Sequence, residues 1–543
     1  MSSQGVLVFL QCRCMKVTAW YNWLGLLGGS LIVVATRWIY KSQYLFHWDS
    51  VQFALALDKI DIVGHRPHPP GYIFYIWIAR LFRQFVQDDN TALILVGICF
   101  SIIGLWVVFY FAKFIFKSVL AGWIAALLFI VNVSIWFHGL VAEVYLIEAV
   151  VALSVIFVLY WVWQNPKPER IVLATGLLGL VGGFRQTTEL VLLPLLVYVL
   201  ISTRTAFKYW IYSGVALILA NLLWLIPVTI NTGGLTRYYD AVARLASVVF
   251  VFDYYRLGLW GKIVKNLKLQ IDVFRMAILA ELVVLYLAAS PYLMRGAGKT
   301  YQVNWSKVWF WILVILPALL FMATTLVTNA GYLMIVILPT IVLVSGGLVS
   351  LLNHLTKRWR PIYAQTLLGI LLLAVSSYQV YNFYNIRPEK FEFISASLPS
   401  IKQHDVLLND IITTIQNNGT SQNSAVWVNT EHTLLFFGIR HLQYYLPDFD
   451  IYRWTPQSFI QDVGQEIWHV RGPMVDQFEP QISIGSQVKK LFSLRDNWGP
   501  MHRKYEIPIT LPSGNTMVYY DLTDEDTRQY LQKEYDFAFR EST

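Results

Sequence analysis

The chain has 543 residues, of which 56% are hydrophobic, 15% aromatic and only 14% charged, and its mean hydropathy is +0.50. Soluble proteins carry about 25% charged residues, so the composition excludes a water-soluble enzyme, and its hydrophobicity excludes a disordered chain. Three cysteines exclude a disulfide framework. The sequence therefore predicts a polytopic membrane protein, and we attribute its net charge of +9 to cytoplasmic loops rather than to nucleic-acid binding.

The charge changes sign near residue 385. Residues 385–543 carry 14 Lys and Arg against 20 Asp and Glu, a net charge of −6, whereas residues 1–384 carry 28 against 13, a net charge of +15. Such a shift is typical of a domain boundary. We expect a cytoplasmic N-terminus at 1–16, a multi-span membrane domain at 17–384 with its first outer loop at 37–90, and an extracytoplasmic soluble domain at 385–543.

Eleven apolar segments approach the length of about 20 residues that a bilayer-spanning helix needs. They lie at 17–36, 91–112, 119–137, 142–163, 171–184, 187–202, 209–229, 270–291, 307–327, 332–352 and 362–383. The fifth and sixth segments are short and the first merges into an aromatic stretch, so counts from ten to thirteen stay open.

Residues 71–85 form a further apolar run that is short and carries Arg80 and Arg83. We interpret this run as a helix lying in the membrane interface. With this choice the N-terminus and every short basic loop fall on one side, which the positive-inside rule makes cytoplasmic. The first outer loop and the C-terminal domain then face the outside of a plasma or inner membrane, or the lumen of the endoplasmic reticulum in a eukaryote.

The first outer loop combines acidic, histidine and arginine side chains at the membrane surface. It contains His47-Trp48-Asp49-Ser50 and, further on, Arg66-Pro67-His68-Pro69-Pro70-Gly71-Tyr72. Between them, residues 50–60 have amphipathic helical spacing, which predicts that Val51, Leu55 and Ile60 face lipid. The residues alone leave two interpretations open, a solvated aspartate in a loop or a catalytic carboxylate.

The pair Trp48-Asp49-Ser50 and His68-Pro69-Pro70-Gly71-Tyr72 resembles the GT-C superfamily of membrane glycosyltransferases, in particular the branch related to protein O-mannosyltransferases. The resemblance implies an all-α polytopic membrane domain with about 11 transmembrane helices. It also implies a polyprenyl-phosphate sugar as donor, and a protein, lipid or glycan as acceptor. An acid in the first outer loop is the catalytic base of that family, and by position this acid is Asp49.

Two softer matches follow along the chain. Residues 136–145 occupy the place of the family's second outer loop, and Glu143 would be its acid, although a carboxylate favoured at a helix start is an alternative. Glu148 lies deeper in an apolar segment, where a carboxylate is costly, and ranks below Glu143. The third match is Gly331-Tyr332-Leu333, followed by Pro339.

The implied reaction needs one base beside an acceptor hydroxyl and cations beside the leaving phosphate, which predicts inversion at the anomeric carbon. We expect Asp49 and Glu143 to be catalytic. The candidates for phosphate or sugar contacts are Arg66, His68, Tyr72, Arg185, His47 and His138. Gln52 stands where the family often has a second acid, so no cofactor is predicted and a divalent metal is poorly supported.

Two other function classes stay open. One is a transporter or flippase of lipid-linked sugars, and the other is a non-catalytic subunit that keeps the GT-C fold. The polar residues gather in outer loops rather than at mid-membrane, and the sequence shows no convincing internal repeat, which disfavours a transporter.

Residues 388–543 are predicted to form a soluble α/β domain. The expected elements are helices at 401–417 and 432–445, strands at 425–428 and 450–454, and a hairpin at 505–511 and 516–522. The sequence leaves open whether this domain recognises the acceptor or only stabilises the fold.

Overall fold

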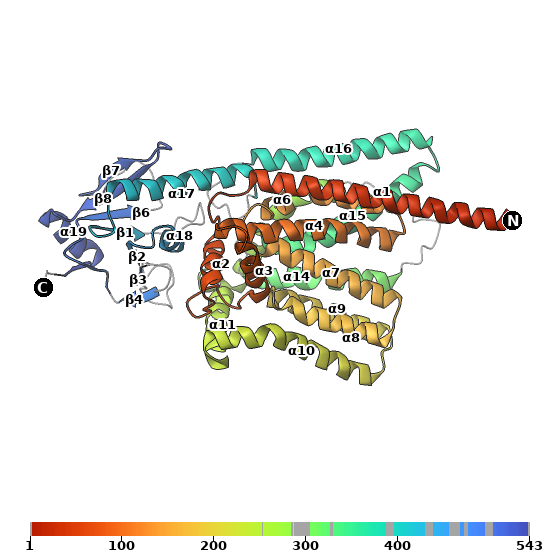
Figure 1. Ribbon diagram of the computed structural model, residues 1–543, viewed down its shortest axis with the longest axis horizontal. Coiled ribbons are helices and arrows are strands. Elements are labelled where there is room, and N and C mark those ends of the chain that lie inside the picture. The colour runs from red at the N-terminus through yellow and green to blue at the C-terminus, as the bar shows by residue number, and fades with distance from the viewer. Residues whose placement is uncertain are drawn as a thin grey trace.

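A computed structural model gives the structure of the chain for residues 3–251, 254–283, 286, 304–325, 329–386, 396–428, 438–454, 467–471, 476–479, 481–494 and 503–540. Long helices lie side by side in an elongated bundle (Figure 1). The N-terminus lies at one end of the molecule, and the strands of the C-terminal region lie beyond the other end of the bundle. The predicted fold class, an all-α membrane domain followed by an α/β domain, is confirmed.

The bundle consists of α1 (Ser3–Tyr40), α4 (Asp89–Phe116), α5 (Val119–Val131), α7 (Tyr145–Gln164), α8 (Pro168–Val181), α9 (Gln186–Ser202), α10 (Phe207–Thr232), α12 (Tyr254–Ala277), α14 (Trp305–Thr324), α15 (Met334–Leu355) and α16 (Pro361–Asn385). Within the described residues, seven helices are long and apolar enough to cross a membrane. They are Trp20–Tyr40 of α1, α4, α7, α10, α14, Ala330–Leu355 including α15, and α16. The chain is thus an integral membrane protein.

Four of the eleven predicted segments, at 119–137, 171–184, 187–202 and 270–291, are not among these seven helices. The segments predicted at 171–184 and 187–202 correspond to α8 and α9, which have only 14 and 17 residues. The segment predicted at 119–137 is divided at Asn132, whose extended ψ of 125° ends α5 and whose side chain caps α6 (Val133–His138) by accepting from Ile135 N–H. The segment predicted at 270–291 lies partly outside the described residues.

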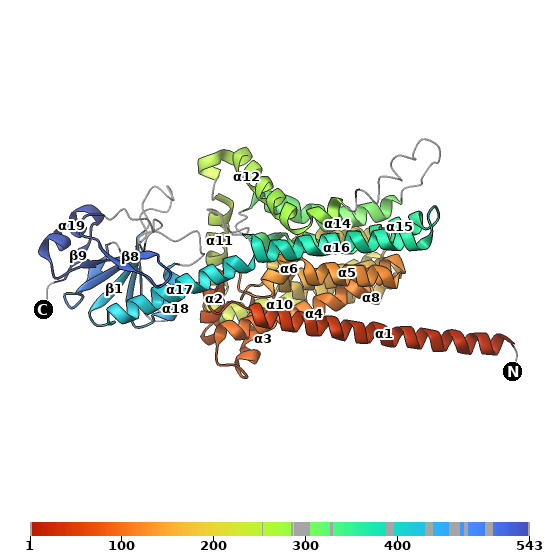
Figure 2. The same cartoon turned by 90° about the horizontal axis from the view of Figure 1, so that it is seen from above.

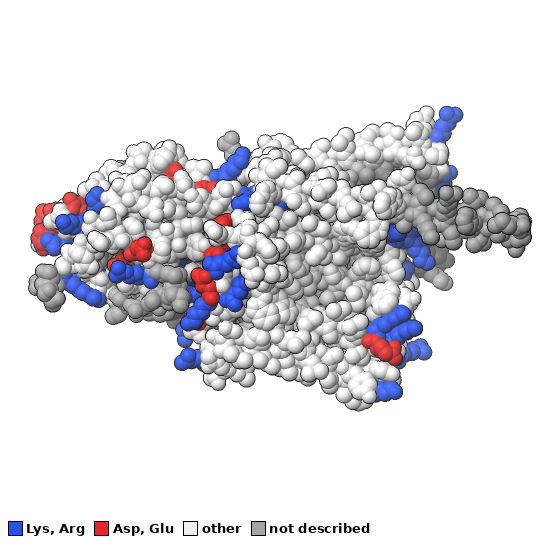
Figure 3. Space-filling view, viewed as in Figure 1, with Lys and Arg blue, Asp and Glu red and all other residues white. Residues whose placement is uncertain are grey.

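Charged side chains gather at the two ends of the bundle. The face in Figure 3 shows Lys and Arg grouped at the end that carries the N-terminus, and mixed charges where the bundle meets the C-terminal region. A nearly uncharged band separates the two groups. This distribution is the one that a bilayer requires of a spanning bundle.

Short elements cover the end of the bundle next to the C-terminal region, among them α2 (Trp48–Asp58), α3 (Ile73–Arg83), α11 (Leu235–Val251) and η1 (Ala330–Leu333) (Figures 1 and 2). At about 1.5 Å per residue, the 11 residues of α3 extend only about 16 Å, which is too short to cross a bilayer.

The prediction that α2 exposes Val51, Leu55 and Ile60 to lipid is wrong. Val51 is fully buried, and Leu55 and Ile60 are each 3% exposed. The physical reason is that α2 contacts α3 and α4 of the membrane domain on one side and α18 (Ile439–Tyr445) of the C-terminal region on the other. An amphipathic pattern identifies the helix but not the surface that covers its apolar face.

The arginines of α3 join neighbouring elements. Arg80 donates to the carbonyl oxygens of Leu57 and Ala56 at 2.9 and 2.8 Å, so it satisfies the C-terminal end of α2. Arg83 pairs with Asp58 at 2.5 Å and with Asp89 at 2.7 Å. These contacts fix α3 against α2 and α4.

The C-terminal region is built around a mixed sheet. Its elements are α17 (Leu398–Asn418), β1 (Ser424–Val428), α18, β2 (Asp450–Trp454), β3 (Ile467–Val470), β4 (Asp476–Glu479), β6 (Lys490–Leu494), β7 (Ile507–Thr510), β8 (Thr516–Asp521) and α19 (Glu525–Tyr535), with a small pair of β5 (Ser483–Ile484) and β9 (Ala538–Phe539). The strand order is β4-β3-β2-β1-β6-β8-β7, and β1 runs parallel to β2 and β6. Of the helix predicted at 432–445, residues 439–445 form α18 and 432–437 lie outside the described residues.

Helices cover both faces of this sheet. Alternate residues of β1 point to opposite faces. Val426 packs with Leu408 of α17 and Leu442 of α18, and Trp427 packs with Leu531 of α19. The first core also receives side chains from the first outer loop, Tyr44 and Trp48, so the two parts of the chain share one hydrophobic cluster.

Candidate functional site

The first outer loop places Asp49 in the first turn of α2. His47 caps this helix, since its Nδ1 accepts from the Asp49 N–H at 3.1 Å and its own N–H donates to Ser50 Oγ at 3.1 Å. A carboxylate in the first helical turn is favoured by the helix dipole. The local sequence therefore places Asp49 in the first turn of α2 and favours its ionised form.

The two motifs of the first outer loop meet at the Asp49 carboxylate. Its Oδ2 lies 3.6 Å from His47 Nδ1, and its Oδ1 lies 3.6 Å from His68 Nδ1. His68 Nε2 in turn lies 2.9 Å from the Tyr72 hydroxyl. Gly71 between them has φ of +125°, a conformation that side-chain-bearing residues rarely adopt. The Asp49 side chain is 24% exposed, so it is open to an incoming molecule.

Glu143 lies near the same nitrogen of His47 as Asp49 does, but it is buried. Its Oε1 is 4.0 Å from His47 Nδ1 and accepts from Asn329 Nδ2 at 2.9 Å, and its side chain is 1% exposed. Its Oε2 lies 3.5 Å from His138 Nε2. The Gly331 N–H donates to Asn329 Oδ1 at 2.8 Å, which fixes the orientation of the amide.

The third motif also reaches this site. A side chain at Gly331 would collide with the ring of Tyr145, so the close approach of η1 to α7 requires glycine. Tyr332, the next residue, covers the guanidinium of Arg185, whose carbon lies 4.7 Å from the Tyr332 ring centre and 4.9 Å from that of Tyr145. Stacking of this kind holds an arginine in place.

Arg185 forms a buried ion pair. Its guanidinium donates to Glu148 Oε2 at 2.7 Å, and the hydroxyl of Thr188 donates to the other oxygen of Glu148. Both charged side chains are 9% exposed. Arg185 precedes α9, where it lies between α8 and α9.

A small, partly open pocket lies beside this ion pair, with room for about one water molecule. Part of its lining is charged or polar and the rest is apolar. The charged or polar residues are Glu148, Arg185, Thr187 and Tyr332, and the apolar residues are Val191, Phe321, Met322 and Ile335. The pocket therefore presents a cation next to hydrocarbon side chains.

The two carboxyl groups of the site differ in pKa. Burial opposes ionisation of Asp49, but the His68 and His47 rings and Arg185 outweigh it and hold its pKa below the ordinary value. Burial, and then the negative charge of Asp49, raise the pKa of Glu143 to about 8. Burial also lowers the pKa values of His47 and His68. At neutral pH the site thus combines an ionised, partly exposed carboxylate with a neutral, buried carboxyl group.

The predicted site residues fall into two groups. The structure brings together His47, Asp49, His68, Tyr72, Glu143 and His138, and Arg185 acts on Asp49 through its charge. Arg66 is 2% exposed, and its backbone pairs with Asp61 in a turn of the same loop.

Asn329, Tyr145 and the pairing of Glu148 with Arg185 were not predicted. The signal for Asn329 is its position two residues before the Gly331-Tyr332-Leu333 motif, since its side chain there bonds to Glu143. The part of the chain that the structure describes contains no group of three or more His, Cys, Asp or Glu side chains that could hold a metal ion.

Comparison with known proteins gives one family and several solved structures. Residues 53–209 match the family described as protein O-mannosyl-transferase TMEM260 N-terminal domain. This stretch includes His68, Tyr72, Glu143 and Arg185, and begins just after Asp49. No curated protein has a sequence that matches the chain.

The solved structures are distant. ArnT from Cupriavidus metallidurans is 12% identical both bound to undecaprenyl phosphate (TM-score 0.48, covering 79% of this chain and 86% of that one) and in the apo state (TM-score 0.45, 78% and 85%). The Archaeoglobus fulgidus oligosaccharyltransferase in complex with Zn and sulfate is also 12% identical (TM-score 0.43, 75% and 60%). These values are too low to support an argument about the site. The family match over residues 53–209, less than a third of the chain, agrees with the resemblance to protein O-mannosyltransferases; it includes the motif His68-Pro69-Pro70-Gly71-Tyr72 and begins after Trp48-Asp49-Ser50.

Proposed function

We propose that the chain is a glycosyltransferase that moves a sugar from a polyprenyl-phosphate donor to an acceptor on the extracytoplasmic face, with inversion of the anomeric carbon. The observation that carries this proposal is the pair of unlike carboxyl groups. Asp49 is ionised and 24% exposed, whereas Glu143, which also lies near His47 Nδ1, is neutral at pH 7 and 1% exposed. Environments that separate two carboxyl pKa values assign different roles to the two groups.

Asp49 is the base in this reaction. It takes the proton of the acceptor hydroxyl while the hydroxyl oxygen forms a bond to the anomeric carbon. The bond between this carbon and the phosphate oxygen breaks, and the polyprenyl phosphate leaves with its electron pair. Retention would need a second accessible carboxylate as nucleophile close to the first. Glu143 is too deeply buried to act as this nucleophile, and its burial favours a single inverting displacement.

The side chains that line the pocket beside Arg185 have the chemistry that the donor needs. Arginine binds phosphate through charge-assisted hydrogen bonds, and the apolar side chains Val191, Phe321 and Ile335 suit the first part of a polyprenyl chain. Arg185 then stabilises the negative charge that develops on the leaving phosphate. A phosphate there competes with Glu148 for the guanidinium.

The remaining predicted residues support these two groups. His68 and Tyr72 border the exposed side of Asp49 and are placed to contact the sugar or the acceptor. His47 Nδ1 lies within 4.0 Å of both carboxyl groups. His138 and Arg66 are 0% and 2% exposed, so we assign them to holding Glu143 and the outer loop in place.

A labelled donor tests the function directly. The purified protein in liposomes is given tritiated polyprenyl-phosphate mannose together with the protein and lipid fractions of the host membrane. Covalent transfer of label to either fraction supports the glycosyltransferase. Movement of the donor between leaflets without transfer identifies a flippase. If the protein neither transfers nor moves the donor, it is a non-catalytic subunit. The anomeric configuration of a labelled product distinguishes inversion from retention.

A further inference from the structure

The segment that leads into the site has no secondary structure of its own. Residues 41–47 connect α1 to α2 and form neither helix nor strand. Backbone N–H groups of such a segment must find partners elsewhere when they leave water. Ser42 N–H finds one inside the bundle, the carbonyl oxygen of Leu140 at 3.0 Å.

The next three N–H groups bind to the C-terminal region. Gln43 N–H and Tyr44 N–H donate to the two oxygens of the Asp405 carboxylate at 2.8 and 3.3 Å. Leu45 N–H donates to the Tyr445 hydroxyl at 2.8 Å. Three consecutive backbone groups of the catalytic loop are thus held by side chains about 360 to 400 residues further along the chain.

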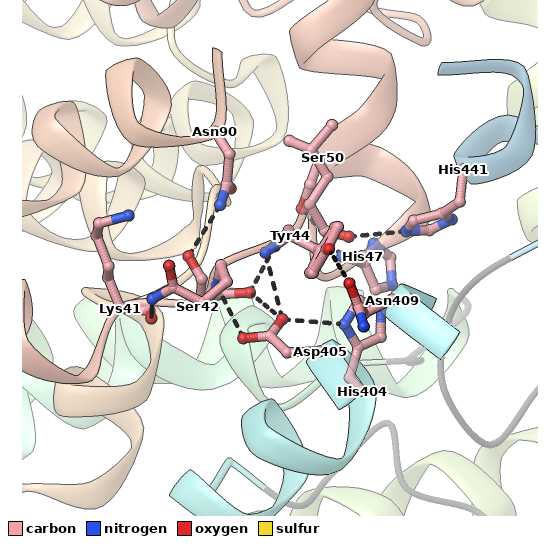
Figure 4. Close-up of polar contacts among 12 residues, drawn as sticks. Lys41, Ser42, Tyr44, His47, Ser50, Asn90, His404, Asp405, Asn409 and His441 are labelled. Atoms are coloured by element: carbon pink, nitrogen blue, oxygen red, sulfur yellow. Dashed lines mark hydrogen bonds and ion pairs between the residues drawn. The ribbon is translucent and has the colours of Figure 1, made fainter. Parts of the chain in front are cut away.

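Side chains of the segment make the same connection (Figure 4). Ser42 Oγ donates to Asp405 Oδ1 at 2.9 Å, and the Tyr44 hydroxyl donates to Asn409 Oδ1 at 2.7 Å. His441 Nε2 lies 2.9 Å from the Leu45 carbonyl oxygen. Asp405 and Asn409 belong to α17 and His441 to α18, so two helices of the C-terminal region hold residues 42–45 of the outer loop.

We propose that Asp405 is a positioning residue for the transfer reaction: by holding residues 42–44 against α17, it sets the position of His47 and Asp49. This proposal rests on the proposed function. Asp49 lies only four residues beyond Leu45, and His47 caps the helix that carries it. A carboxylate is a stronger acceptor for backbone N–H groups than a neutral oxygen. The C-terminal region is therefore part of the catalytic apparatus rather than only a stabilising cap.

Helix α17 contains a matched control for this carboxylate. Asp410 lies five residues after Asp405 and is buried, and its Oδ2 accepts from the Ser513 N–H at 2.8 Å in the turn between β7 and β8. Asp410 therefore binds a backbone amide with the same chemistry, but within the C-terminal region. Asp405→Asn and Asp410→Asn remove one negative charge each from the same helix.

Three measurements on the full-length protein test the proposal. Amide hydrogen exchange reports on residues 42–45 without any activity. Steady-state transfer gives kcat, and a binding titration with polyprenyl phosphate gives its dissociation constant. For Asp405→Asn we expect about 10-fold faster exchange at Gln43 and Tyr44. We also expect kcat to fall by about 10- to 100-fold, because Asp49 is displaced from the acceptor hydroxyl. The dissociation constant for polyprenyl phosphate should not change, because the residues around Arg185 stay in place. Asp405→Glu should recover part of the kcat, and Asp410→Asn should leave exchange and kcat near the wild-type values.

Several results overturn the proposal. Unchanged exchange in Asp405→Asn shows that the carboxylate does not hold the segment. If Asp405→Asn exchanges faster but keeps the wild-type kcat, the contact has a structural role only. If kcat falls equally in Asp410→Asn, the loss of activity comes from a less stable C-terminal region. If the wild-type protein transfers no sugar, both the proposed function and the positioning role fail. Faster exchange at Gln43 and Tyr44 in Asp405→Asn would then still show that Asp405 holds this segment, in a purely structural role.

Discussion

Asp49 and Glu143 both lie within 4.0 Å of His47 Nδ1, yet their surroundings give them opposite protonation states at neutral pH. The His68 and His47 rings and Arg185 hold the pKa of Asp49 below its ordinary value in spite of its burial, whereas burial and the charge of Asp49 raise the pKa of Glu143. The sequence identifies both acids by their motifs. It does not predict that only one of them reaches the surface, because that depends on η1 covering Glu143 through Asn329.

The raised pKa of Glu143 predicts how stability varies with pH. A folded-state pKa of about 8 exceeds the ordinary value of 4.5, so the folded protein keeps a proton that the unfolded chain releases. The contribution of Glu143 to stability is therefore complete below pH 4.5 and is lost as pH rises toward 8, at about 1.4 kcal/mol per pH unit. Thermal unfolding between pH 5 and 8 should show a smaller decline for Glu143→Gln than for the wild type. Parallel curves for the two proteins would contradict the assignment.

Arg185 requires a double substitution for a fair test. Arg185→Ala alone leaves Glu148 buried and unpaired, which costs about 3–5 kcal/mol and can unfold the protein. Arg185→Gln with Glu148→Gln removes both charges and keeps hydrogen-bonding groups. We expect this variant to fold and to raise the KM for the lipid donor about 10-fold or more, because charge-assisted bonds to phosphate contribute about 1.5–3 kcal/mol. A folded double variant with wild-type donor kinetics removes Arg185 from the donor site.

At the scale of elements, the hydrophobic pattern predicts that a helix or strand exists better than it predicts which parts of the chain that element contacts. The strand at β2 and the helix at α17 agree with their predicted ranges, since alternation and amphipathic spacing are local signals. The break at Asn132 and the burial of α2 were not predicted. They depend on contacts with parts of the chain far away in the sequence, such as α18.

Arg80 illustrates such a contact and carries a prediction of its own. Its bonds to Leu57 and Ala56 at the end of α2 predict that Arg80→Met destabilises the protein by about 1–3 kcal/mol. Arg275→Met is the control, because Arg275 is 70% exposed and its pair with Asp272 spans 3.8 Å. Exposed pairs of this kind contribute at most about 1 kcal/mol. Equal unfolding temperatures for Arg80→Met and the wild type would refute the capping role.

At the scale of the whole molecule, the site lies where the helical bundle meets the C-terminal region. The basic connections at the other end and the uncharged band between them predict that the site faces outward and that the N-terminus faces the cytoplasm (Figure 3). The sequence predicts the two parts of the chain, but not that α17 and α18 hold the loop that carries Asp49.

Single cysteines test this orientation. In a background with Cys12, Cys14 and Cys99 replaced by serine, Gln422→Cys marks the turn before β1 and Ala206→Cys marks the connection between α9 and α10, both at exposed positions. A membrane-impermeant maleimide should label position 422 in intact cells and position 206 only after permeabilisation. The opposite pattern would invert the proposed topology and place the site in the cytoplasm.

The transfer rate of Asp49→Asn tests the central claim most directly. The amide keeps the size of the side chain and its position beside His47 and His68 but cannot accept the proton of the acceptor hydroxyl. With unfolding temperature and donor binding as checks that the variant is folded, kcat for sugar transfer should fall by about 100- to 10,000-fold. A folded Asp49→Asn protein that transfers sugar at the wild-type rate would contradict the assignment of Asp49 as the catalytic base.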